Sequence, residues 1–249
     1  MKGDDIMRIA IHQPHYFPWI GYLDKMSKVD KFILLDNVQL TDKSNMFRNK
    51  FMSKTGNEKY LTVCFAKSGY MHKAFRDVEL NDTVNWQKDH INFLKDNYKK
   101  AEYYDEIWQF IYPLLEKKYQ YICDVAIESL IIIKNIFEIP TEIVLQSEIN
   151  YDSKAKNNDL VLDICKEMKA NQYLSGNGAR KYMDLDSFIN ENIQVEYQQF
   201  NHPVYTQCNS PNFLTNLSAL DLLFNCGIKN SREIFWKNVK STNEFKNIS

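Results

Sequence analysis

Two histidines and three aromatic side chains stand close together in HQPHYFPW, residues 12–19 of the chain. An imidazole near neutral pH can take up or release a proton and can bind an anion. We therefore predict His12 and His15 as catalytic residues, with His12 as the general base. Gln13, Tyr16 and Trp19 are predicted to bind substrate, the two rings by stacking on a base or a sugar. The alternative is structural, because prolines and rings in a loop can also pin a turn against the core.

The elements on either side place this motif at the edge of a sheet. An apolar run at residues 6–11 predicts a strand, and a helical pattern begins at Trp19. KFILLD at residues 31–36 predicts a second buried strand, and a right-handed crossover makes the two strands parallel. Ligands of open α/β sheets bind outside the carboxyl ends of the strands, where a helix start also offers N–H groups to phosphate or carboxylate. The motif is thus predicted to lie at a ligand site.

A second candidate loop follows the strand predicted at residues 172–174. Its sequence SGNGAR, residues 175–180, is a glycine-containing turn that can present backbone N–H groups to an anion. Ser175, Gly176 and Arg180 are predicted to bind substrate there. The alternative is again structural, since many such sequences are turns and nothing more.

Charged and polar residues on neighbouring elements extend the predicted site. The further substrate-binding residues are Lys25, Asp36, Gln39, Arg48 and Lys50. Arg48 and Lys50 share one face of a predicted strand because strand side chains alternate. Together with the two histidines and Arg180, the cations Lys25, Arg48 and Lys50 suit the binding of a nucleotide or a nucleotide-sugar. We expect one pocket to be lined by four of the named residues: His12, Trp19, Arg48 and Arg180.

The remaining pattern predicts an α/β fold with a mainly parallel sheet of about five strands. Residues 47–53 and 59–65 predict a β-hairpin with Lys54-Thr55-Gly56-Asn57 as its turn. We expect a single α/β domain over residues 1–249, with residues 71–120 inserted as a helical cap. Further strands are predicted at 142–145 and 193–197, and helices at 86–98, 102–119, 121–137, 159–168, 213–224 and 231–239.

The composition excludes several function classes. A net charge of −1 with 14 % aromatic residues gives no sign of a nucleic-acid-binding tail. Residues 1–5 are polar and no apolar run is long enough to span a bilayer, so we expect no leader, no membrane insertion and a cytoplasmic location. The five cysteines have no CxxC spacing, which predicts reduced thiols and no metal site.

Six segments resemble the WbqC-like proteins and follow the order found in that family. They are HQPHYFPWIGYLDK at residues 12–25, LLDNVQ at 34–39, FRNKF at 47–51, LTV at 61–63, YLSGNGARKYMD at 173–184 and LSALDLLFNCG at 217–227. Cys64 stands where proline would be expected after LTV, and a lysine- and asparagine-rich run precedes Leu160. The resemblance implies a protein of bacterial surface-polysaccharide (O-antigen-type) gene clusters. It also implies a transferase that adds an acyl or aminoacyl group, glycyl among them, to an amino sugar of a nucleotide-sugar.

The strand, loop and helix around the motif also resemble the nucleotidyltransferase-like α/β fold or a related three-layer fold. That superfamily opens the helix with HxGH and binds ATP phosphates there, whereas this chain has Trp19-Ile20-Gly21-Tyr22. ATP is accordingly a candidate cofactor, and ATP-dependent nucleotidyl transfer is an alternative function. A non-catalytic module that binds a nucleotide-sugar is another, and a homodimer is left open. The absence of GxSxG, P-loop and HExxH motifs argues against serine hydrolases, P-loop kinases and zinc peptidases.

Overall fold

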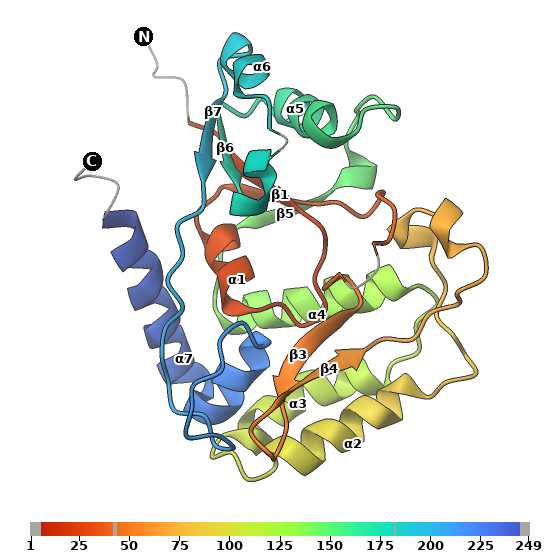
Figure 1. Ribbon diagram of the computed structural model, residues 1–249, viewed down its shortest axis with the longest axis vertical. Coiled ribbons are helices and arrows are strands. Elements are labelled where there is room, and N and C mark those ends of the chain that lie inside the picture. Colours follow the sequence, from red (N-terminus) through yellow and green to blue (C-terminus); the bar gives the residue numbers. More distant parts are fainter. Residues whose placement is uncertain (1–5, 42–43, 182, 245–249) are drawn as a thin grey trace. The chain divides into compact units, whose positions relative to one another are not determined.

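The computed structural model describes residues 6–41, 44–181 and 183–244 (Figure 1). These residues form two compact units. Unit 1 comprises residues 6–13, 25–37 and 140–200 of the described part, and unit 2 comprises residues 14–24, 38–139 and 201–244. The chain passes between the units after residues 13, 24, 37, 139 and 200. Residues 1–5, on which the expectation of no leader rested, lie outside the described part.

Unit 1 is built on a parallel sheet of five strands in the order β5-β2-β1-β6-β7. The strands are β1 (Arg8–His12), β2 (Lys31–Leu34), β5 (Glu142–Leu145), β6 (Gln172–Ser175) and β7 (Gln194–Tyr197). The three middle residues of the central strand β1 are apolar and buried, as in parallel strands covered on both faces. The predicted α/β class with a mainly parallel sheet is therefore confirmed.

Helices and short 3₁₀ turns complete unit 1. Helix α5 (Asn157–Glu167) buries an apolar stripe that includes Leu160 and Ile164. Helix α6 (Leu185–Asn190) packs on the sheet through Phe188, whose ring stacks 6.0 Å from Tyr173 of β6. The 3₁₀ turns are η3 (Gln146–Glu148) after β5 and η4 (Asn177–Lys181) after β6.

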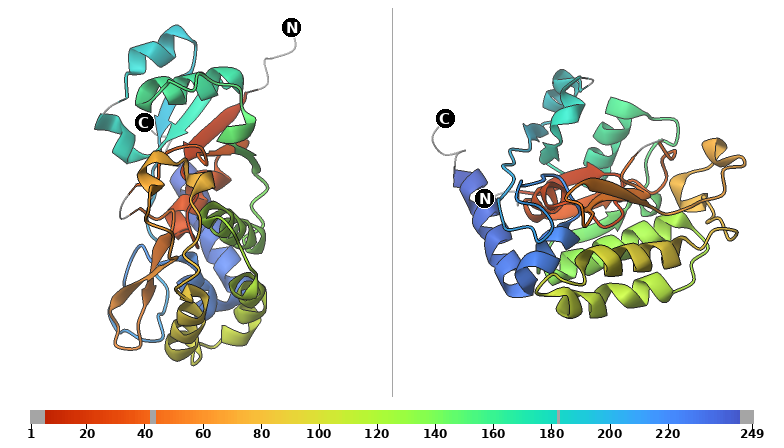
Figure 2. Two further views of the ribbon diagram at one scale, coloured as in Figure 1. Left: turned by 90° about the vertical axis from the view of Figure 1, so that its right-hand side faces the viewer. Right: turned by 60° about the horizontal axis from the view of Figure 1, so that its bottom comes forward.

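Unit 2 combines a β-hairpin with long helices. The hairpin of β3 (Arg48–Met52) and β4 (Glu58–Thr62) confirms the prediction, and Gly56 in its turn has a φ of 75°. Figure 2 shows α2, α3 and α4 side by side. The helices and 3₁₀ turns of unit 2 are η1 (Tyr70–His72), η2 (Phe75–Asp77), α2 (Trp86–Tyr98), α3 (Tyr104–Glu116), α4 (Ile122–Ile136) and α7 (Ala219–Glu244). Helix α1 (Ile20–Ser27) begins in unit 2 and ends in unit 1.

The helix predicted to begin at residue 213 begins at Ala219 instead. The side chain of Gln207 explains the difference. Its Oε1 accepts from the N–H of Leu214 and its Nε2 donates to the carbonyl of Leu214, at 2.8 and 3.0 Å. Because both backbone groups of Leu214 are bound in this way, they are not available for helical hydrogen bonds. Asn216, with a φ of 60°, further separates this loop from the helix.

Three expectations about composition can be compared with the described residues. All five cysteines are free thiols. Within the described ranges, no helix is long and apolar enough to cross a membrane. The same residues contain no group of three or more histidine, cysteine, aspartate or glutamate side chains placed to hold a metal ion.

Gly227 interrupts α7 with a φ of 73° and a ψ of 170°, a conformation open almost only to glycine. A Cβ at this position would lie 2.5 Å from a ring carbon of Tyr103. We expect Gly227→Ala to lower the free energy of unfolding by about 1–3 kcal/mol, measured by urea denaturation. Gly178→Ala is the control, because a Cβ at Gly178 would meet nothing within 4 Å. Equal stability of the two variants would contradict this account of the interruption.

Candidate functional site

The strand order of unit 1 defines where its sheet can bind a ligand. Numbered along the chain within this sheet, β5-β2-β1-β6-β7 is the order 3-2-1-4-5. The order reverses between β1 and β6, and open α/β sheets bind their ligands outside the carboxyl ends of the two strands at such a switch point. His12 ends β1 and Ser175 ends β6, so both predicted loops begin at the switch point.

Strand β1 separates from β6 before it reaches the switch point. β1 pairs with β2 over four residues as far as His12, but with β6 only at Arg8 and Ile9. On the other side, a Cβ placed on Gly176 would meet no heavy atom within 4 Å, so the Gly176 backbone borders open space. A ligand could therefore approach the backbone closely after β6.

Lys25 is the most unusual ionisable residue of unit 1. Its side chain is 3 % exposed, and its Nζ donates a hydrogen bond to the carbonyl of Ile11 in β1 at 2.9 Å. Burial lowers the pKa of Lys25 to about 7. A buried lysine with such a pKa is partly uncharged at neutral pH and can accept a proton or act as a nucleophile.

His12 is half-buried, and the charge of Lys25 acts on its imidazole ring. Its Nδ1 lies 3.1 Å from the carbonyl of Gln13, which can only accept, so Nδ1 carries the proton and Nε2 is the acceptor of the neutral ring. Burial, and to a lesser extent the charge of Lys25, lower the pKa of His12 to about 3. His12 is thus uncharged near neutral pH and a weak base, whereas Lys25 has the pKa expected of a general base.

Arg180 lies on η4 and reaches back over β7. Its guanidinium carbon stands 3.8 Å from the centre of the Tyr197 ring, and its Nε donates to Oδ1 of Asn177 at 3.2 Å. The side chain is exposed, so it can contact a ligand without rearranging the core. Ser175 is fully buried, and its hydroxyl makes a long 3.4 Å contact with the carbonyl of Gly176.

Asp36 has a structural partner on another loop of unit 1. Its two carboxylate oxygens accept from the N–H and the hydroxyl of Ser147, at 2.9 and 2.6 Å. This pair of bonds joins the loop after β2 to the 3₁₀ turn after β5. A carboxylate so occupied is suited to holding the two loops together.

The rest of the aromatic motif belongs to unit 2. The ring of His15, 8 % exposed, packs 4.5 Å from the ring of Tyr22. The hydroxyl of Tyr16 donates to Nδ1 of buried His90 at 2.9 Å, and the other ring nitrogen of His90 faces the carbonyl of Thr62 at 3.2 Å. Burial lowers the pKa of His90 to about 4, so this imidazole is neutral. Tyr16 is therefore a buried member of the core in unit 2.

The remaining predicted residues of unit 2 contact their own neighbours. The half-buried Trp19 ring packs directly on Gly21, where a Cβ would overlap it. On the hairpin, the guanidinium carbon of Arg48 lies 4.3 Å from the Tyr60 ring centre, and Lys50 pairs with Glu58 at 2.8 Å. Gln39 is exposed, and its Nε2 donates to the carbonyl of Met71 at 2.8 Å.

The structure thus brings together part of the predicted site. One set lies in unit 1, where His12 and Ser175 end the two strands at the switch point: His12, Gln13, Lys25, Asp36, Ser175, Gly176 and Arg180. The other set lies in unit 2: His15, Tyr16, Trp19, Gln39, Arg48 and Lys50. A pocket shared by His12, Trp19, Arg48 and Arg180 stays a prediction.

Comparison with known proteins identifies the family. The sequence model of the WbqC-like protein family matches residues 13–233. This chain belongs to the WbqC-like protein family. A relative from Mycobacterium tuberculosis (strain ATCC 25618 / H37Rv), named "Uncharacterized protein Rv1507c", is 30 % identical over 223 residues, which cover 88 % of this chain and 94 % of the relative. No solved structure gives a significant match.

Several residues of this WbqC-like protein that support the site escaped prediction. Tyr197 and Asn177 position Arg180, and Ser147 holds Asp36. Nothing in the sequence pairs these residues, although Tyr197 ends a predicted strand beside the second loop. The lowered pKa of Lys25 could not be predicted from the sequence either. The sequence pattern of α1 does not reveal that this helix is buried on nearly every side.

The pKa of Lys25 predicts a dependence of stability on pH. Between about pH 7 and 10.5 the unfolded chain keeps a proton that the folded protein has released, so folding stability gains with rising pH. The free energy of unfolding of the natural protein minus that of Lys25→Met should rise across this window by up to about 1.4 kcal/mol per pH unit. Urea denaturation at several pH values measures it, with exposed Lys54→Met as the control. A difference that is constant with pH would refute the lowered pKa.

Proposed function

We propose that this WbqC-like protein is a cytoplasmic transferase of bacterial surface-glycan (O-antigen-type) biosynthesis. It would join an acyl or aminoacyl group, glycyl among the candidates, to the amine of an amino sugar carried on a nucleotide. The class of reaction comes from the family resemblance. The observation that supports a catalytic role is the buried amine of Lys25, with a pKa of about 7, beside the carboxyl end of β1 at the switch point.

The proposed reaction needs one proton acceptor. The sugar amine attacks the carbonyl carbon of the donor, the new C–N bond forms, and the bond from carbon to the leaving group breaks. The nitrogen then loses a proton, which uncharged Lys25 accepts and passes to the leaving group. Acyl donor and amino sugar thus become the amide and the protonated leaving group, and every atom is accounted for. A base works best with a pKa near the working pH, which favours Lys25 over His12 for this step.

His12 would lie beside the reacting groups in this scheme. Burial keeps its imidazole uncharged near neutral pH, so the ring places no positive charge beside the attacking amine. Backbone N–H groups of the loop at Gly176, with Arg180, would stabilise the developing oxyanion or the phosphates of the nucleotide. Gly176 suits this role because nothing fills the space beside its backbone.

Two alternatives each have an observation in their favour. The strand order 3-2-1-4-5 matches the first five strands of the classic dinucleotide-binding sheet, 3-2-1-4-5-6, which supports an ATP-using or nucleotidyl-transferring enzyme. ATP could also activate a carboxylate donor as an acyl-adenylate in the main scheme. The burial of His15 against Tyr22 favours a non-catalytic module that binds a nucleotide-sugar.

The test of catalysis is an assay by mass spectrometry with nucleotide-linked amino sugars, ATP and amino acids. We expect Lys25→Met to reduce turnover roughly 10²- to 10⁴-fold, the usual contribution of positioned proton transfer. In the natural protein, activity should fall as the pH drops below about 7 because Lys25 becomes protonated. Lys31→Met, at the other end of the neighbouring strand, is the control and should retain activity. Full activity of the Lys25→Met variant would contradict the catalytic role of Lys25. Release of pyrophosphate without formation of an amide would favour nucleotidyl transfer.

Nucleotide binding can be measured separately by calorimetric titration. Arg180→Ala should weaken binding by about 1.5–3 kcal/mol, the value of a lost hydrogen bond to a charged group. Lys181→Ala is the matched control, since Lys181 is the next exposed cation on the same turn. If both variants bind every nucleotide as the natural protein does, Arg180 does not contact the ligand.

A further inference from the structure

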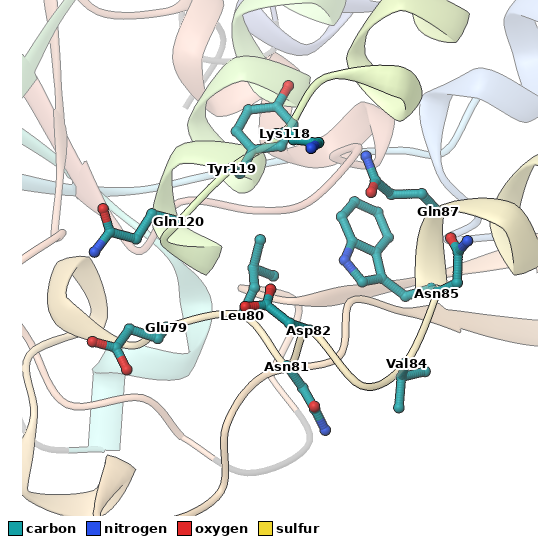
Figure 3. Close-up of a pocket in the computed structure, with 11 residues that line it drawn as sticks. Glu79, Leu80, Asn81, Asp82, Val84, Asn85, Gln87, Lys118, Tyr119 and Gln120 are labelled. Atoms are coloured by element: carbon teal, nitrogen blue, oxygen red, sulfur yellow. The ribbon is translucent and has the colours of Figure 1, made fainter.

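A polar cavity of about 720 Å³ lies in unit 2, far along the chain from the switch-point residues. It lies between residues 79–87, which lead into α2, and residues 118–120, which connect α3 to α4. Figure 3 shows Glu79 and Gln120 at one end and Asn85 and Gln87 at the other. The volume is typical of small-molecule sites and exceeds that of a single pyranose ring.

Hydrogen bonds between the two segments hold the walls of this cavity in place. The N–H of Leu80 donates to the carbonyl of Gln120 at 3.0 Å. Nε2 of Gln87 donates to the carbonyls of Leu115 and Lys117, at 2.9 and 2.7 Å. Because these bonds do not involve a ligand, the cavity is preformed, as binding sites for small molecules usually are.

The lining combines two kinds of group that a sugar ring uses. The carboxylates of Glu79 and Asp82 accept hydrogen bonds, and the side-chain amide of Gln120 both accepts and donates them. The half-buried Tyr119 adds aromatic surface, on which the C–H face of a pyranose can pack, and Leu80 and Val84 add apolar surface. A hydroxylated ring therefore finds both hydrogen-bonding and apolar contacts here.

The charge of the lining disfavours phosphorylated ligands. Asp82 and Glu79 carry negative charge, although Glu79 pairs with Lys73 at 3.7 Å, and Lys118 is the positively charged residue of the lining. A nucleotide would bring at least one further negative charge toward two carboxylates, which is unfavourable. A neutral sugar, or an amino sugar with its ammonium group, meets no such repulsion.

We propose that this cavity is a carbohydrate-binding site for an unphosphorylated hexose or hexosamine unit. It would hold part of a glycan in unit 2, whereas the proposed reaction is assigned to residues of unit 1. The proposal does not rest on the transfer reaction.

Saturation-transfer NMR with a panel of free sugars tests the site. The probes are glucose, galactose, mannose, glucosamine and N-acetylglucosamine, each compared with glucosamine 6-phosphate. At least one unphosphorylated sugar should bind, and the phosphorylated one should bind more weakly. Asp82→Asn should weaken binding about 10-fold, consistent with the loss of a hydrogen bond to a charged group. Asp77→Asn, an exposed aspartate outside the cavity, should leave binding unchanged.

A second variant tests whether the effect of Asp82→Asn arises from lost binding or from a change in the fold. Tyr119→Ala should also weaken binding, while thermal unfolding of both variants should match that of the natural protein. The proposal is overturned if no sugar binds at concentrations on the order of 10 mM. It is equally overturned if the phosphorylated sugar binds best, or if Asp82→Asn and Asp77→Asn bind alike. None of these results bears on the Lys25 assay, because that assay measures transfer.

Discussion

The parallel pairing of β1 between β2 and β6 is the constraint on which the candidate site depends. Ile9 and Ala10 are fully buried and Ile11 nearly so, which makes the centre of unit 1 dry. The strand keeps its pairing with β2 up to His12 and loses its pairing with β6 earlier. The same strand therefore provides a rigid wall, an apolar interior and an open end at the switch point.

The dry interior has an electrostatic consequence for the nearby ionisable groups. Burial disfavours the charged form of both His12 and Lys25, so their pKa values fall to about 3 and about 7. The sequence suggested that both would add positive charge to a nucleotide site. Above pH 7, however, of the three candidate cations in unit 1 Arg180 carries the full charge. Binding of phosphate at the switch point would then depend on Arg180 and on backbone N–H groups, while Lys25 would accept the proton in the proposed reaction.

Local patterns predicted the elements, and long-range contacts decided the chemistry. The apolar runs at β2 and β5 and the turn of the β3–β4 hairpin have the composition of the structures they form, so the α/β fold was predictable. The partners of individual side chains were not. Asp36 is held by Ser147, 111 residues away, and Tyr16 by His90, 74 residues away. Likewise, the position of Gln207 against Leu214 decides where α7 begins, although residues 213–218 have a helical pattern. Such contacts need the folded chain before they can be named.

Because the chain alternates between the units, strands of unit 1 that pair with one another are made far apart in time. β2 pairs with β5, whose first residue follows Lys31 by 111 positions, and β1 pairs with β6 only after residue 172 has been made. On the ribosome, most of unit 2 emerges between β2 and β5, so the first two strands must wait with one or both edges unpaired. Closing such long loops is slow, and open strand edges can pair with other chains. The nascent protein is therefore most vulnerable to aggregation while residues 38–139 are being translated, well before the candidate site exists.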